Sequence, residues 1–126
     1  MPGIRSTPDA AIAVFEREPY WAPELTRQFA DGRILVRSCT RLSDVDRVLA
    51  EWPRSLCVME FETAPAAILG WLATRANGAT ARPVLIFAEQ GAARLEWTLR
   101  EAGATSFRSE LISSRELAAH CRRLLG

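Results

Sequence analysis

The stretch SLCVMEFET, residues 55–63, is a run of strand-forming apolar side chains that stops at a carboxylate, Glu60, with a second carboxylate at Glu62. A short run that is apolar on both faces is typical of a strand covered on both sides, as in a parallel sheet flanked by helices. A carboxylate at the end of such a strand is costly to bury unless it has a partner or a function. The stretch therefore predicts a buried strand over residues 56–61 with a candidate functional group at its carboxyl end.

Runs of the same kind recur along the chain and alternate with segments of helical spacing. The predicted strands are residues 11–15, 33–36, 56–61 and 84–88, with a weaker one at 105–109. In the segments that follow them, apolar residues recur every three or four positions, as on the buried side of a helix. These helical stripes are Trp21-Leu25-Phe29, Leu42-Val45-Leu49-Trp52, Ile68-Leu72-Ala76, Leu95-Leu99-Ala102 and Leu117-Cys121-Leu124.

This alternation predicts an α/β domain with five parallel strands and five helices that cover both faces of the sheet. Ser113 and Glu116 have the spacing of a capping box, and Ser43 and Asp46 have the same spacing with Asp in place of the usual Glu. We expect one domain over residues 10–126, after a flexible leader at residues 1–9 that carries Pro, Gly and Ser. In such sheets, binding sites lie at the carboxyl ends of the strands, where Glu60 lies.

The composition disfavours several classes of function. The 16 basic and 15 acidic residues nearly cancel, which argues against nucleic-acid binding. All the basic residues are arginines, so no mechanism that needs a lysine amine can operate. The three cysteines form no CxxC pair and fit a reducing cytoplasm. No apolar stretch is long enough for a membrane span, and no GxGxxG or P-loop motif supports a nucleotide or flavin cofactor.

With these units in place, the sequence resembles the receiver domain of bacterial two-component response regulators over nearly the whole chain, residues 11–125. The motifs that carry the resemblance are IAVFERE (12–18), SLCVMEF (55–61), RPVLIFAE (82–89) and LREAGATSF (99–107). They resemble the first, third and fourth strands of the family and the passage from its fourth helix into its fifth strand. The resemblance implies a flavodoxin-like (βα)5 fold with strand order 2-1-3-4-5 and a role in signal transduction.

The residues that perform phosphotransfer in that family are replaced in this chain. The resemblance places Glu16, Arg17 and Glu60 at the two acids that hold magnesium and at the phosphoacceptor aspartate. It places Ala88 where a hydroxyl residue contacts the phosphoryl group, and Glu110 where a lysine pairs with it. The resemblance therefore implies a degenerate phosphoacceptor pocket with no metal, no cofactor and no enzymatic activity.

Arg17 would place a fixed positive charge in this pocket, where it would repel magnesium. We expect its guanidinium to occupy the space of the metal and to pair with Glu16, Glu60 or both. The domain would then be held in one state and would act through protein–protein contacts that do not depend on phosphorylation.

Trp97 is the candidate anchor for such contacts. It lies roughly 200° around its predicted helix from the inward-facing Leu99, so we expect it to face outward. In receiver domains the fourth helix, fifth strand and fifth helix form the usual partner or dimer face. We assign Trp97, Phe107, Arg94 and Arg100 to this face, for a protein partner or a second copy in a homodimer. In the plainer alternative, Trp97 lies flat over the stems of Arg94 and Arg100.

A function of another class remains open, namely a small-ligand-binding or enzymatic module that uses the acidic rim at the strand ends. His120, the only histidine, has no nucleophile pattern beside it, and we expect it at the surface or its border and not as a general base. Cys39 is the one thiol near the rim, but position 45 is Val in place of the arginine of a phosphatase loop. A bound ion, nucleotide or metabolite would favour this alternative.

Overall fold

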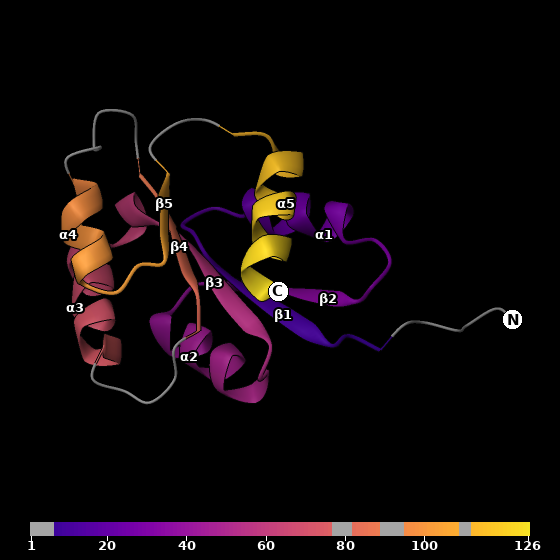
Figure 1. Ribbon diagram of the computed structural model, residues 1–126, viewed down its shortest axis with the longest axis horizontal. Coiled ribbons are helices and arrows are strands. Elements are labelled where there is room, and N and C mark those ends of the chain that lie inside the picture. The colour runs from indigo at the N-terminus through magenta and orange to yellow at the C-terminus, as the bar shows by residue number, and fades with distance from the viewer. Residues whose placement is uncertain (1–6, 77–81, 89–94, 109–111) are drawn as a thin grey trace, which may run out of the picture.

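The computed structural model describes residues 7–76, 82–88, 95–108 and 112–126, which form a sheet with helices on both faces (Figure 1). All strand pairs are parallel and the order is β2-β1-β3-β4-β5, so the predicted fold class and strand order are confirmed. The strands are β1 (Ala10–Phe15), β2 (Ile34–Cys39), β3 (Ser55–Glu60), β4 (Val84–Phe87) and β5 (Ser106–Arg108). The helices are α1 (Trp21–Gln28), α2 (Leu42–Glu51), α3 (Pro65–Ala76), α4 (Glu96–Glu101) and α5 (Ser114–Leu125), with a 3-10 turn η1 (Phe61–Thr63).

Each face of the sheet has its own apolar core, because successive side chains of a strand point to opposite faces. Ile12 and Val14 of β1 pack in the core beneath α1 and α5. Ala11, Ala13 and Phe15 pack in the core beneath α2, α3 and α4. Figure 1 shows α5 and α1 on one side of the sheet and α3 and α4 on the other, with β5 between α4 and α5.

β2 differs from the other strands in its exposure. It lies at the edge of the sheet and pairs only with β1. Ile34, Leu35 and Val36 are half-buried, and Arg37 and Ser38 are exposed. The prediction that this strand is covered on both faces is therefore wrong, because α2 packs mainly over β1 and leaves much of this edge strand uncovered.

One of the two predicted capping boxes is present. The Ser113 hydroxyl accepts a hydrogen bond from the Glu116 N–H at 3.1 Å, and the Glu116 carboxylate accepts one from the Ser113 N–H. The capping box predicted at Ser43 is wrong. The helix α2 begins at Leu42 with Arg41 as its N-cap residue, so Ser43 lies inside the first turn. Asp46 instead accepts a hydrogen bond from the Trp71 indole N–H at 2.8 Å, which joins α2 to α3.

The chain joins the sheet just before β1. Residues 1–6 of the predicted leader lie outside the described residues. The Asp9 N–H donates to the Arg33 carbonyl at 3.0 Å, and the Asp9 carboxylate pairs with Arg54 at 3.0 Å. Within the ranges that the structure describes, no helix has the length and apolar character needed to cross a membrane.

Candidate functional site

Glu16, Glu60 and Ala88 lie at the carboxyl ends of the neighbouring strands β1, β3 and β4. The parallel register of β3 with both β1 and β4 brings the carboxyl ends of these strands together, at the edge where α/β sheets place their sites. Ala88 supplies only a methyl group there. Glu110 lies outside the described residues. No group of three His, Cys, Asp or Glu side chains in the described part of the chain could hold a metal ion.

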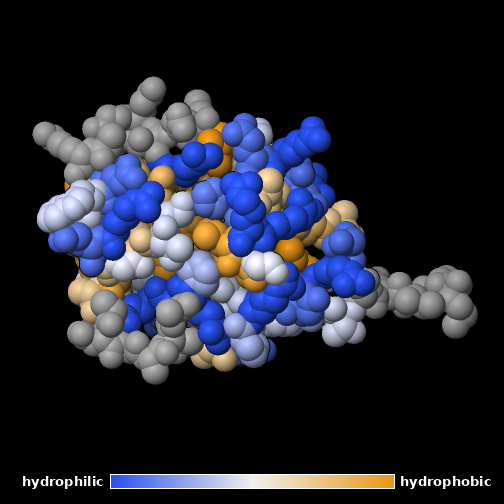
Figure 2. Space-filling model, viewed as in Figure 1, coloured by the Kyte–Doolittle hydropathy of each residue, from blue (hydrophilic) through white to orange (hydrophobic). Residues whose placement is uncertain are grey.

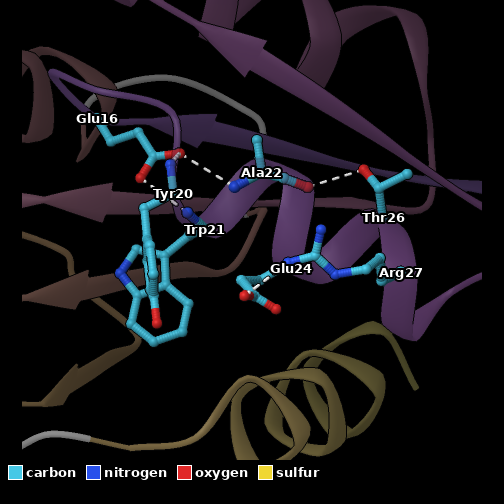
Figure 3. Close-up of polar contacts among 7 residues, drawn as sticks. All are labelled: Glu16, Tyr20, Trp21, Ala22, Glu24, Thr26 and Arg27. Atoms are coloured by element: carbon cyan, nitrogen blue, oxygen red, sulfur yellow. Dashed lines mark hydrogen bonds and ion pairs between the residues drawn. The ribbon is translucent and has the colours of Figure 1, made fainter.

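The Glu16 carboxylate caps the first helix of the fold. Its Oε2 accepts hydrogen bonds from the N–H groups of Tyr20 at 3.1 Å and Ala22 at 3.0 Å, and its Oε1 accepts one from the Trp21 N–H at 3.0 Å (Figure 3). α1 has no side-chain cap from its own N-cap residue, so Glu16 satisfies N–H groups that the first turn leaves without partners. Its charge also lies at the positive end of the helix dipole. Glu16 is only 4% exposed, so its carboxylate is fully engaged within the fold.

Arg17 does not form the expected ion pairs. Its Nη2 donates to the backbone carbonyl of Glu62 at 3.2 Å, and its side chain is exposed. The Oε1 of Glu60 accepts a hydrogen bond from the Thr63 hydroxyl at 2.9 Å, within the turn η1 that follows β3. The predicted pairing of Arg17 with Glu16 or Glu60 is wrong, because each carboxylate is directed to donors a few residues farther along its own loop. Glu60 therefore has a local partner.

An aromatic stack that the sequence did not predict adjoins the Glu16 cap. The rings of Trp21 and Phe87 are stacked, with centroids 5.2 Å apart and an interplanar angle of 6°. The Tyr20 ring meets the Trp21 ring edge-on at 4.9 Å. Tyr20 remains 58% exposed. The stack joins the start of α1 to the end of β4 and holds the helix start in place beside the rim.

The residues assigned to the interaction face differ in their exposure. Trp97 is 70% exposed, which confirms its predicted outward orientation. Arg100 pairs with Glu96 on the same helix at 2.8 Å. Phe107 is only 6% exposed and packs in the core beneath α2, α3 and α4, so it offers no free surface to a partner. Arg94 lies outside the described residues.

His120 forms a polar link between α5 and β5 that the sequence did not predict. Its Nε2 lies 3.0 Å from the Ser106 hydroxyl, and its Nδ1 lies 3.4 Å from Nη2 of Arg123. A guanidinium can only donate, so Nδ1 accepts and the neutral ring donates from Nε2 to the serine. A catalytic Ser–His pair needs the reverse polarity, in which the serine donates to the ring. Burial, together with the charges of Arg123 and Arg108, lowers the pKa of His120.

One described groove lies at the carboxyl end of β2, where Cys39 pairs with Phe15 of β1, and another lies at the amino end of β2. Cys39 lines a groove of about 290 Å³ between β2 and α2, but burial raises the pKa of its thiol to about 11, so the reactive thiolate is scarce. A second groove, of about 810 Å³, runs beside Phe29 and Ile34 at the amino end of β2. Neither groove is lined by Glu16 or Glu60, so neither supports a ligand site at the acidic rim.

Comparisons with known proteins identify the fold. No protein-family model matches the sequence, and no curated protein matches it. The receiver domain of the TMAO respiratory system response regulator TorR matches with a TM-score of 0.72 and 15% identity, over 92% of this chain and 96% of that one. The N-terminal domain of the nisin resistance regulator NsrR matches with a TM-score of 0.71 and 19% identity, over 93% and 98%.

A response regulator receiver protein from Burkholderia phymatum also matches, with a TM-score of 0.68 and 17% identity, over 93% of this chain and 95% of that chain. Each match spans nearly the whole of both chains. The chain therefore has the fold of response-regulator receiver domains, as the resemblance of its sequence implied.

Proposed function

We propose that this chain is an atypical receiver domain, a pseudo-receiver, that acts in bacterial two-component signalling by binding a protein and not by accepting phosphate. The partner is another protein or a second copy of the chain, and it docks on the face formed by α4, β5 and α5. The domain works in the cytoplasm without metal or cofactor, catalyses no reaction, and binds neither nucleic acid nor membrane. The receiver fold supports the signalling role, and the free, buried cysteines fit a reducing compartment.

The engagement of Glu16 is the observation that carries this proposal. A magnesium ion needs several oxygen ligands at nearly ideal octahedral positions. Both oxygens of Glu16 already accept backbone hydrogen bonds at 3.0–3.1 Å. Oε2 accepts two of these bonds, which uses both of its lone pairs, and turning the carboxylate toward a metal would weaken the hydrogen bonds that hold the start of α1. The residue that resembles a metal ligand therefore serves as a structural cap.

The other positions of the pocket support the same conclusion. Glu60 is held by Thr63 at 2.9 Å, and Arg17 brings a positive charge to the adjoining loop, where its Nη2 contacts the Glu62 carbonyl. Ala88 has no hydroxyl with which to contact a phosphoryl group, and the chain contains no lysine. Charge stabilisation of a transferred phosphoryl group needs preorganised cations and donors at these positions.

The exposed Trp97 supports docking through the α4-β5-α5 face. A tryptophan that is 70% exposed contributes little to the fold but can bury a large apolar area against a partner. Trp97→Ala is therefore expected to leave the stability of the domain within about 0.5 kcal/mol of the wild type while weakening association.

Treatment with acetyl phosphate and magnesium, followed by intact mass spectrometry, tests the absence of phosphotransfer. We expect no added phosphoryl group on the wild type or on Glu60→Asp, which restores the acceptor residue but not the rest of the pocket. A receiver domain that is labelled under the same conditions serves as the positive control. Stable labelling of the wild type at Glu60 would contradict the proposal.

A further inference from the structure

The outer edge of β2 is a surface that the docking face proposed above does not include. The sheet ends in β2 on one side and in β5 on the other, and Figure 1 shows the two strands on opposite sides of the sheet. β5 has only three residues, whereas β2 has six, in unbroken parallel register with β1. The free edge of β2 therefore presents the longer row of backbone N–H and C=O groups to a further strand.

The first half of β2 lacks the features with which proteins usually block such an edge. Those features are a proline, a β-bulge, or charged side chains along the strand. Ile34, Leu35 and Val36 are consecutive aliphatic residues that are only half-buried, and the register with β1 shows no bulge at these positions. This part of the strand is therefore able to pair with another extended segment.

The groove of about 810 Å³ runs along the same part of the strand. It is lined by Ile34, Leu35 and Val36 of β2 and by Phe29 at the end of α1. Leu35 packs toward the core beneath α2, α3 and α4, whereas Ile34 and Val36 pack toward the core beneath α1 and α5. Because residues from both faces of the strand line the groove, it follows the edge of the sheet and does not lie over one face.

The charges at this edge are positive and lie on either side of the aliphatic residues. Arg33 and Arg37 are both exposed, and neither forms an ion pair with a carboxylate of the described residues. The nearest acids along the chain and in the adjoining groove are Asp31, which accepts the Arg33 backbone N–H at 3.1 Å, and Asp44 and Glu51, which line the groove at the carboxyl end of β2. Both guanidinium groups are therefore available to carboxylates of a partner.

We propose that β2 binds an extended segment of another protein as an additional strand of the sheet. The segment places aliphatic residues opposite Ile34, Leu35 and Val36, and an acidic residue opposite each of Arg33 and Arg37. Main-chain hydrogen bonds supply the affinity of such strand addition, and the side chains select the segment. Opposite charges on directly facing residues of two strands stabilise the pairing. The partner sequence that fits this edge is therefore acidic, aliphatic, aliphatic, aliphatic, acidic.

A second copy of the chain fits this edge less well. A two-fold dimer through β2 pairs the two strands antiparallel, each with the same residues. With Leu35 on the two-fold axis, Arg33 of each copy lies opposite Arg37 of the other, and like charges that face each other across strands destabilise the pairing. Moving the axis away from Leu35 separates the arginines but takes aliphatic side chains out of register.

Strand addition also suits the character of the rest of the surface. On the face of the molecule that Figure 2 shows, the described residues form only small hydrophobic areas among hydrophilic side chains. A segment held by main-chain hydrogen bonds needs less apolar surface than one held by side chains alone. Because β2 and β5 are the two ends of the strand order, a domain with one partner at each edge would join two proteins.

An amide NMR titration of the full chain with defined peptides tests the proposal. The probe peptide contains Glu-Val-Leu-Val-Glu between Gly-Ser ends. One control peptide carries Lys in place of both Glu residues. The other carries Pro in place of the two aliphatic residues that precede the second Glu, so that at least one of the lost N–H groups would have pointed at β2.

We expect saturable shifts of the Ile34, Leu35, Val36 and Arg37 amides with the Glu peptide, and slower hydrogen exchange at alternate amides of β2. The proline peptide should cause no shifts. Arg37→Gln should weaken binding of the Glu peptide about twofold to fivefold at low salt, and Arg37→Glu should shift the preference toward the Lys peptide. The matched control is Arg115→Glu, on exposed surface of α5, which should leave binding unchanged.

Several results would overturn the inference. Absence of shifts in β2 with the Glu peptide would remove the binding site, and equal binding of the proline peptide would exclude strand addition. Sedimentation of the wild type as a dimer, with concentration-dependent shifts of the β2 amides, would assign the edge to a second copy. Shifts of the same amides in Ile4→Ser without peptide would assign the groove to residues 1–6, which precede Thr7 and Pro8 on its wall. The function proposed above is tested separately, by phosphoryl uptake from acetyl phosphate.

Discussion

Replacing Glu16 by alanine tests whether this carboxylate holds the fold together. The side chain is 4% exposed and accepts hydrogen bonds from Tyr20, Trp21 and Ala22 at 3.0–3.1 Å. The substitution would leave the start of α1 without any side-chain acceptor, because the N-cap residue supplies none. We expect a loss of stability with no change in the overall fold.

The magnitude follows from the burial of the three donors. A buried donor left without a partner costs about 1–3 kcal/mol, and this full cost applies to the Ala22 N–H, whose bond to Glu16 is buried. The hydrogen bonds from Tyr20 and Trp21 are only partly buried. Water can therefore replace the lost acceptor, and the loss of each bond costs about 0.5 kcal/mol. Glu16→Ala should therefore destabilise the domain by about 3 kcal/mol. Glu16→Gln, which keeps the shape and one acceptor oxygen, should cost about half as much.

Urea unfolding measures this loss. With a denaturant slope of about 2 kcal/mol per molar, the midpoint of Glu16→Ala should fall by about 1.5 M. Glu24→Ala is the matched control on the same helix, because Glu24 forms only a surface pair with Arg27 (Figure 3) and should cost less than about 1 kcal/mol.

An unchanged midpoint for Glu16→Ala would refute the capping role. A higher midpoint for Glu16→Gln would refute the argument that Glu16 is a structural cap and not a metal ligand. Removing a charge stabilises a site in which carboxylates repel one another. Glu16 would then belong to an acidic pocket that awaits a metal, and would not be a cap of α1.

Three further predictions concern capping, pH and thiol chemistry. Ser113→Ala should destabilise the domain by about 1 kcal/mol, whereas Ser43→Ala, inside the first turn of α2, should stay within about 0.5 kcal/mol of wild type in urea unfolding. The pKa of His120 is lowered from 6.5 in the fold, so the unfolded chain binds the proton first and stability should fall as the pH drops below 6.5. His120→Gln should flatten this pH dependence, and an identical slope in the variant would contradict the assignment. Burial raises the thiol pKa to about 11 for Cys39 and about 12 for Cys121, so iodoacetamide should modify them only after unfolding, and rapid labelling of the native protein would contradict this.

Local periodicity was sufficient to predict the units of the fold. Short runs that are apolar on both faces predict the buried strands, as in β3 and β4. The strand order came from the resemblance and not from the periodicity. The outward position of Trp97 followed from its angle around the helix, since that angle depends only on the spacing from Leu99.

Features that depend on tertiary contacts were not predicted from the sequence. The exposure of β2 follows from its place at the sheet edge together with the packing of α2 mainly over β1, which its own composition does not encode. Asp46 has capping-box spacing but lies where Trp71 of the next helix reaches it. His120 meets Ser106 because α5 lies against β5.

The charged rim was misinterpreted for a related reason. The expected pairing of Arg17 with Glu16 assumed that opposite charges at the carboxyl ends of the strands form ion pairs. Backbone N–H groups at the start of α1 compete for the carboxylate and hold it at 3.0–3.1 Å. Apolar periodicity carries no information on such loop geometry, although a buried acid shortly before a helix with no Ser, Thr, Asp or Asn at its N-cap is a usable signal.

The central claim is that the pocket at the strand ends no longer binds magnesium or a phosphoryl group. An amide NMR titration with magnesium, followed by magnesium with beryllofluoride, tests this most directly, because the fluoride adduct mimics a phosphoryl group on an acceptor carboxylate. We predict no saturable shifts at Glu16, Arg17, Glu60 and Ala88. Saturable shifts at these residues would contradict the claim and would make the domain a ligand-controlled switch.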